Sequence, residues 1–348
     1  MSVALDFGLE TDWLLEAATG LPTMEQAALA IPPIPSGAEG TWAAHLAAML
    51  TCWVNTNDGE SRADRLKAVL ESRALPPTVY ASAQRFRAYS LRNRDLDREA
   101  LEIFDRLIDE GAPGMSVTIS QRCETLMKLG QLTEARRVID ELSSHDMRAR
   151  VLSAAFKRWH GHLGEAALGF SERADALQRA GRLRLARENN SVAMETASFL
   201  SPPKIEEWIK LRTEAGDVAI DNHYRTRCSA VALATAGDHA EYPRAVGELR
   251  NAFEVFEPGE SGSVLTWRLW LPDAFDAAIR ADAVALKASI ERISHPMWVT
   301  IASFWLPLAE PKATMHTGVA QWAEPEESVI ERWQQVVLDR RQHLAESL

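Results

Sequence analysis

The phrase Gly130-Gln-Leu-Thr-Glu-Ala135 decides the fold, because versions of it return as Gly161-His-Leu-Gly-Glu-Ala166 and Gly181-Arg-Leu-Arg-Leu-Ala186. A looser version, Arg94-Asp-Leu-Asp-Arg-Glu-Ala100, precedes them. In each, glycine or a polar residue ends one helix, leucine anchors the next, and the small alanine lets two helices approach closely. A helix break and restart that recurs at regular spacing predicts a stack of helical hairpins.

Composition narrows the class of protein. The chain has 348 residues, of which 46% are apolar and 25% charged, so it can bury a sizeable core. A formal net charge of −11 argues against direct nucleic-acid binding, which needs a basic face. The three cysteines (Cys52, Cys123 and Cys228) lie far apart and indicate buried thiols in a reducing compartment. Residues 1–7 lack the pattern of a signal peptide and no run of about 18 apolar residues occurs, so we expect a cytoplasmic protein that does not interact with membranes.

Turn residues and apolar periodicity divide the chain into three parts. Residues 1–75 are expected to form an N-terminal helical cap, and residues 264–348 a tryptophan-rich C-terminal helical cap with helices at 273–293 and 326–346. Flanking prolines and β-branched residues leave 297–306 open as either helix or strand. Between the caps, residues 76–257 read as helical hairpins. The helices expected there cover 79–92, 96–110, 116–129, 132–142, 147–160, 163–180, 182–200, 205–215, 217–236 and 242–256.

The spacing of these hairpins resembles that of the tetratricopeptide repeat (TPR) family. Ala100 and Ala135 are 35 residues apart, close to the 34-residue period of a two-helix repeat. Phe104 and Leu107 follow the first alanine as Ile139 and Leu142 follow the second. The resemblance covers about 79 to 200 and is weaker from 217 to 257. It implies an all-α, right-handed α-solenoid of TPR-like hairpins with helical caps at both ends.

The resemblance also implies a ligand site. In a TPR array the first helix of each hairpin lines a concave groove, and polar residues there meet a peptide or protein. The candidate groove residues are Arg85, Tyr89, Arg92, Gln121, Lys128, Asn189, Asn190, Arg225 and Arg227. The asparagine pair costs roughly 0.6 kcal/mol per residue in a helix interior. Either an inter-repeat hydrogen bond or a ligand must therefore account for it.

Catalytic and metal-binding motifs are absent from the sequence. His160 and His162 could form half of a zinc site, but no matching pair of ligands follows, and both fit an interhelical turn. No nucleophile motif or phosphate-cradling glycine loop occurs. We therefore expect a non-catalytic protein without metal or cofactor.

These observations predict a protein- or peptide-binding scaffold or regulatory protein that uses the groove of a TPR-like array. One alternative is a regulator that senses a signal peptide and acts through a partner protein. Another is an all-α enzyme with a pocket between the array and the C-terminal cap. The amphipathic segment from Val329 to Leu344 also permits a homodimer through the C-terminal helices.

Overall fold

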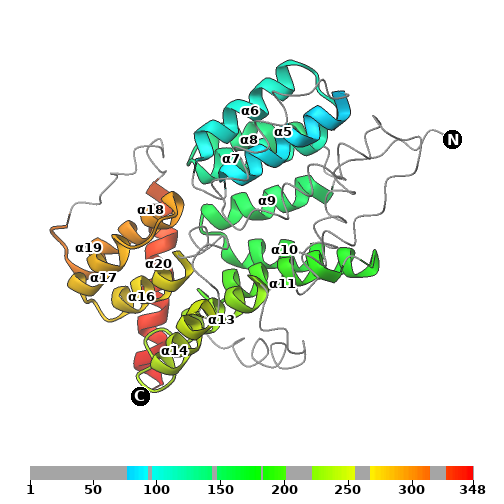
Figure 1. Cartoon of the computed structure of the whole chain (residues 1–348). Helices are drawn as coiled ribbons and strands as arrows, with labels where there is room; N and C mark the ends of the chain where they lie inside the picture. Colours follow the sequence, from blue (N-terminus) through cyan, green and yellow to red (C-terminus); the bar gives the residue numbers. More distant parts are fainter. Residues whose placement is uncertain are drawn as a thin grey trace. The chain divides into compact units, whose positions relative to one another are not determined.

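Figure 1 shows the computed structural model of the chain, in which helices are the only regular secondary structure among the described residues. The described residues are 77–92, 96–142, 147–181, 183–200, 222–254, 267–313 and 327–347. The predicted N-terminal cap and the predicted helix at 205–215 lie outside them. The chain divides into two compact units: Met1–Thr125 with Pro258–Ser261, and Leu126–Glu257 with Gly262–Leu348.

The first unit contains one complete described hairpin and most of the helix that follows. Its helices are α5 (Pro77–Arg92), α6 (Asp97–Asp109) and α7 (Met115–Lys128), whose last turn belongs to the second unit. The predicted core residues of α6 are all buried against α5, as the 3.6-residue period requires. This core consists of Ala81, Ala88, Leu91, Ala100, Ile103, Phe104 and Leu107.

The second unit continues the hairpin pattern. It contains α8 (Leu132–Glu141), α9 (Met147–Trp159), α10 (Leu163–Arg179), α11 (Leu183–Ala197), α13 (Asn222–Thr235) and α14 (Glu241–Glu254). Consecutive described helices pack on one another from α8 to α14, and α11 packs directly on α13 (Figure 1). In α8 the buried positions are Leu132, Ala135 and Val138. Ile139 and Leu142, which the TPR comparison aligned with core positions, are only half-buried.

The recurring phrase forms a defined turn. Gly130 and Gly161 have φ values of 76° and 78°, a left-handed conformation that glycine adopts without strain. The Gly130 N–H donates to Met127 O, and the Gln131 N–H donates to Leu126 O, which together make a Schellman C-cap. The alanine of the phrase then makes the first hydrogen bond of the next helix, from Ala135 N to Gln131 O. The phrase therefore encodes both the end of one helix and the start of the next.

The same turn occurs at Ala281, where the sequence has no glycine to predict it. The helix expected at 273–293 is wrong, because the structure divides this region into α16 (Trp267–Ile279) and α17 (Ala283–Ile290). Ala281 occupies the glycine position with φ 57°, and the Asp282 N–H donates to Ala277 O as in the other turns. Asp282 then caps α17 by accepting hydrogen bonds from Val284 N and Ala285 N.

The segment 297–306 is helical, and the helix expected at 326–346 is present. Residues 297–306, left open as helix or strand, fall mainly in α18 (Pro296–Phe304), which is followed by α19 (Leu306–Ala309). The expected helix at 326–346 is α20 (Glu327–Glu346). Its apolar stripe, which includes Trp333 and Val337, is buried within the second unit.

An aromatic core holds these C-terminal helices to α9 and α11. Trp298, Trp305 and Trp333 are fully buried, and each packs against Phe199, with ring centroids 5.5–6.4 Å apart. Phe275 of α16 also contacts Phe199 edge-on. These three tryptophans therefore form a core and not an exposed surface.

Side chains of α20 satisfy carbonyl groups at the C-terminal ends of other helices, which have no partner in their own helix. The bonds run from Trp333 Nε1 to Trp159 O, Arg332 to His160 O, Arg340 to the carbonyls of Ser198, Leu200 and Ala234, and Arg341 to those of Ala278, Ile279 and Leu308. These acceptor residues lie in the last turn of α9, α11, α13, α16 or α19, or directly after it. A single helix therefore closes one end of several hairpins.

Candidate functional site: the first helices of the hairpins

The predicted site residues lie on α5, α7, α11 and α13, which together with α9 are the helices expected to be the first helices of hairpins. In the first unit, α5 and α7 are joined by polar contacts. Arg85 donates to Pro113 O at 2.7 Å and to the hydroxyl of Thr118 at 3.2 Å. Arg92 donates to Glu124 at 3.1 Å. These bonds join α5 to α7 and to the loop that precedes it.

Arg85 is held inside this unit. It is only 6% exposed, and its guanidinium lies directly under Gly114, where a Cβ atom would come within 2.9 Å of it. Gly114 has φ 81°, so both its backbone and its lack of a side chain suit this position. The structure therefore gives Arg85 a role in joining α5 to the α6–α7 loop.

The other candidates of this unit and of α7 are more accessible. The Arg92 side chain is 15% exposed and that of its partner Glu124 is 43% exposed. Gln121 and Lys128 are half-buried, and the side chain of Tyr89 lies outside the described part of the chain. Lys128, at the end of α7, belongs to the second unit.

In the second unit the candidates divide by burial. Arg225 is 2% exposed, and its guanidinium lies 5.0 Å from the ring centroid of Phe253 on α14, so it packs between the helices of one hairpin. Asn189, Asn190 and Arg227 are half-buried and remain partly accessible to solvent. Of the candidates in this unit, these three and Lys128 suit ligand contact better than Arg225 does.

A buried ion cluster joins the first helices α9 and α11 to α16 of the C-terminal region. Glu195 of α11 is fully buried and accepts hydrogen bonds from Arg158 of α9 at 2.9 Å and Arg268 of α16 at 2.7 Å. Burial by itself raises the pKa of Glu195, but Arg268 and Arg158 outweigh it and hold the pKa of this carboxyl below its usual value. Glu195 is therefore ionised and bridges two cations.

Sequence reasoning missed this cluster, although one signal was present. Glu195 stands alone in the otherwise apolar or small run Val192-Ala-Met-Glu-Thr-Ala197. An isolated carboxylate on a buried helix face needs a cationic partner, because an unpaired buried charge is costly. The partner helices could not be identified from the sequence, since Arg268 is 73 residues away.

His295 lies beside this cluster, at the N-cap of α18. Its ring stacks on Trp159 and meets Trp267 edge-on, with both centroid distances 5.6 Å. Burial lowers the pKa of His295 well below its ordinary value, and the charges of Lys128, Arg158 and Arg268 act in the same direction. His295 is therefore neutral at physiological pH.

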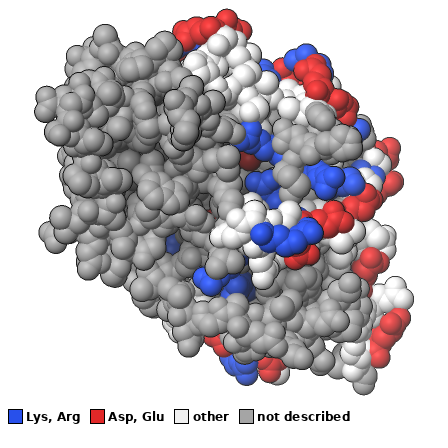
Figure 2. Space-filling model, turned by 90° about the vertical axis from the view of Figure 1, so that its right-hand side faces the viewer, with Lys and Arg blue, Asp and Glu red and all other residues white. Residues whose placement is uncertain are grey.

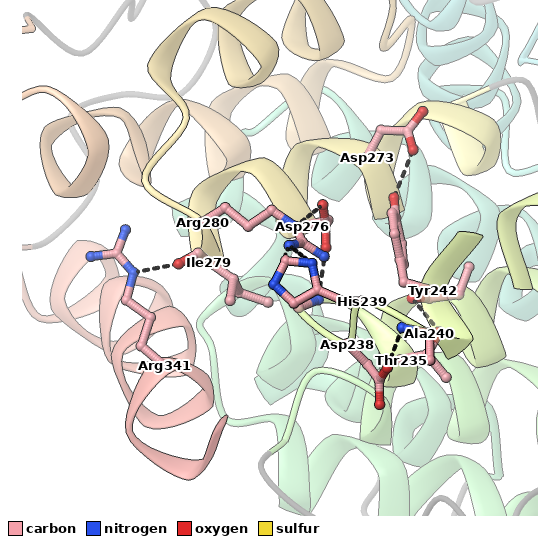
Figure 3. A network of polar contacts seen from close by, with 12 residues as sticks. Thr235, Asp238, His239, Ala240, Tyr242, Asp273, Asp276, Ile279, Arg280 and Arg341 are labelled. Atoms are coloured by element: carbon pink, nitrogen blue, oxygen red, sulfur yellow. Dashed lines mark hydrogen bonds and ion pairs between the residues drawn. The ribbon is translucent and has the colours of Figure 1, made fainter. Parts of the chain in front are cut away.

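A second polar network fixes the α13–α14 turn against α16 (Figure 3). Asp276 accepts from the Gly237 N–H at 2.7 Å and from Arg280 at 2.8 Å, while Tyr242 donates to Asp273 at 2.6 Å. Burial, followed by the charge of Asp273, raises the pKa of Tyr242. Because every one of these groups is engaged in joining two hairpins, we interpret the network as structural.

The two histidines that could suggest a metal site lie in the α9–α10 turn, where the repeat phrase placed them. His160 stacks on Phe156 and its Nδ1 lies 2.9 Å from Phe156 O, while His162 precedes α10 as its N-cap residue. Within the described ranges, no group of three or more His, Cys, Asp or Glu side chains converges on a common point. Within the same ranges, no helix is both long and apolar enough to cross a membrane.

Comparison with known proteins does not assign the chain to a family. No protein-family model matches the chain, and neither the curated proteins nor the solved structures contain a match to it.

Proposed function

We propose that this chain is a non-catalytic binding protein that holds a segment of another protein along the first helices of a TPR-like array. In this proposal the array is a right-handed solenoid and the first helices line its concave groove. The chain would act as a scaffold or regulatory protein through the partner that it holds.

The observation that carries this proposal is the continuous row of first helices in the second unit. Glu195 ties α11 to α9 and to α16, and α13 packs on both α11 and α16. Half-buried polar side chains, including Asn190 and Arg227, lie on this row. Amides and guanidinium groups can hydrogen-bond the backbone and carboxylates of an extended segment. A row of helices also offers such groups at repeated spacing, which suits a linear ligand.

Position-specific crosslinking tests the proposal. A photo-crosslinking residue is placed at Asn190 on the first helix α11, and separately at Leu168 on the second helix α10. Leu168 is 61% exposed, so it serves as a matched control on the other helix type. We expect a protein segment to be captured from position 190 and not from position 168. A synthetic copy of that segment, added in excess, should abolish the crosslink.

Capture from position 168 alone, or equal capture from both positions, would contradict a site on the first helices. Asn190→Ala separates ligand contact from a structural role. Weaker binding of the synthetic segment with an unchanged melting temperature supports ligand contact. A lower melting temperature with unchanged binding would assign Asn190 to an inter-repeat hydrogen bond.

A further inference from the structure

His295 packs against the aromatic residues beside the buried ion cluster. Its ring contacts Trp159 of α9 and Trp267 of α16, with a centroid distance of 5.6 Å to each. The next residues along the chain from these tryptophans are the two cations of the cluster. The guanidinium carbon of Arg268 lies 4.2 Å from the Trp267 ring centroid, and that of Arg158 lies 5.8 Å from the Trp159 ring centroid. The histidine, the tryptophans and the cluster therefore form one packed assembly.

A charged His295 would be unfavourable in this assembly. Burial contributes most to its low pKa, and the charges of Lys128, Arg158 and Arg268 act in the same direction. The helix that it caps, α18, has no charged residue of its own, and the N-terminus of a helix carries partial positive charge. Glu195 already bonds to both Arg158 and Arg268. A proton on His295 would therefore add a cation beside two buried cations that share one carboxylate.

These buried charges differ from the charges on the protein surface. Figure 2 shows one face on which Lys and Arg side chains lie toward the middle and Asp and Glu side chains lie mainly along the right-hand edge. Salt screens such exposed charges over about 8 Å. Arg158 and Arg268 are only 7% and 8% exposed, so salt hardly screens their repulsion of a charged His295.

The buried nitrogen of the His295 ring has no acceptor for a second proton in the described part of the chain. The residue is half-buried, but its Nδ1 atom is buried and has no hydrogen-bond partner among the described residues. In the neutral ring this nitrogen can stay unprotonated, whereas in the charged ring it becomes an N–H donor. A buried charged donor without an acceptor is costly. Protonation therefore favours an arrangement in which the ring reaches water.

The turn that carries His295 gives the ring a route to water. It joins α17 to α18 through residues 291–295, and Arg292 and Ser294 within it are exposed. At the start of α18 the His295 carbonyl accepts from Val299 N at 3.0 Å, and Pro296 has no N–H to donate. A movement limited to this turn and the first turn of α18 would bring the ring into solvent.

We propose that the α17–α18 turn is an acid-sensitive switch, in which protonation of His295 drives its ring from the aromatic contacts into solvent. At neutral pH the ring packs on Trp159 and Trp267 beside the ion cluster. In acid the ring leaves with its turn, and the contact of α18 with α9 and α16 is weakened. The switch is independent of the proposed function, because no ligand takes part in it.

Linkage gives the direction and the size of the effect. In the closed arrangement the ring stays neutral, because its pKa is held well below 6.5. In the open arrangement the ring is in water and titrates near its ordinary value of about 6.5. Each pH unit below that value therefore favours the open arrangement by about tenfold. Between pH 7.5 and 5.5 the open population should rise on the order of tenfold.

Amide hydrogen exchange followed by mass spectrometry tests the switch on the full-length chain. Rates at pH 7.5 and 5.5 are corrected for the intrinsic effect of pH on exchange. We expect peptides covering 292–301 to exchange on the order of tenfold faster at pH 5.5. This exchange should change little with urea below the unfolding transition, because a local opening exposes little surface. A urea dependence as steep as that of global unfolding would overturn the local movement.

Two substitutions remove the titrating group in different ways. His295→Phe keeps an aromatic ring and His295→Gln keeps a polar side chain, so either variant that folds can be compared with the wild type. Each should reduce the effect of pH at 292–301 to less than about twofold. The control His162→Gln removes an exposed histidine and should leave the effect in place. An effect that persists in the His295 variants, or is lost in the control, would assign the titration to another group and overturn the proposal.

Discussion

Glu195 of α11 and Arg268 of α16 form a buried ion pair, in which Arg268 Nε lies 2.7 Å from Glu195 Oε1. The two residues are 73 positions apart in the sequence. The same carboxylate also holds Arg158, so one side chain connects α9, α11 and α16. The helix α16, which lies at the start of the predicted C-terminal cap, is therefore tied to α9 and α11 by a carboxylate that is buried in the second unit.

Removing this carboxylate charge should destabilise the second unit strongly. Glu195→Gln leaves Arg158 and Arg268 buried without a counter-charge, and we expect a loss of about 3–5 kcal/mol in the free energy of unfolding. Urea unfolding followed by circular dichroism measures it. Glu165→Gln, which breaks the exposed pair with Lys157, should hardly shift the urea midpoint. Similar midpoints for both variants would show that the buried cluster contributes no more than a surface pair.

His295 should make stability depend on pH. Because its pKa is lowered in the folded state, only the unfolded state takes up a proton as the pH falls below the ordinary value of about 6.5. Stability is therefore full above that pH and should decline below it, by up to about 1.4 kcal/mol per pH unit. His295→Phe keeps an aromatic ring beside Trp159 and Trp267 and should flatten this decline. Urea midpoints between pH 7.5 and 5 that fall equally in both proteins would contradict the prediction.

The turn at Ala281 offers a stabilising substitution. Alanine at φ 57° is strained by about 1–2 kcal/mol, whereas glycine adopts this conformation freely. After allowing for the greater entropy of glycine in the unfolded chain, Ala281→Gly should raise stability by about 0.5–1 kcal/mol. Gly161→Ala provides the reverse case, because its Cβ would lie 2.9 Å from the Cβ of Arg332 at φ 78°. Thermal unfolding should show a higher midpoint for the first variant and a lower one for the second.

Arg340 of α20 should stabilise the C-terminal ends of α11 and α13. Its guanidinium donates to the carbonyls of Ser198, Leu200 and Ala234, and burial lowers its pKa to about 10, so it remains charged at neutral pH. Arg340→Met keeps much of the side-chain volume but leaves these acceptors unsatisfied, and we expect a loss of about 2–4 kcal/mol.

Gln342→Met is the control for this substitution, because Gln342 bonds only within its own helix to the exposed Glu346. Urea unfolding compares the two variants. Faster amide hydrogen exchange near the ends of α11 and α13 in Arg340→Met alone would locate the loss. Unchanged exchange at both helix ends would contradict the closing role of Arg340.

Local sequence determined the helices and their turns with good accuracy. The phrase ending in Ala135 or Ala166 encodes a glycine-dependent C-cap and a small residue at the next contact, and both operate within a few residues. The expected ranges consequently agree with α5 to α11 within a few residues at each end. The prediction of turns failed at Ala281, because alanine occupies the left-handed position there and the glycine that marks the other turns is missing.

Tertiary structure alone decided which predicted polar residues are accessible and what joins the hairpins. Arg85 and Arg92 are seven residues apart and share one face of α5, yet Arg85 is buried and Arg92 is partly exposed. Helical periodicity gives the face on which a residue lies, but not what packs over that face. The links made by Glu195 and Arg340 also span large sequence separations. Their partners are set by how the helices pack, which no local pattern in the chain records.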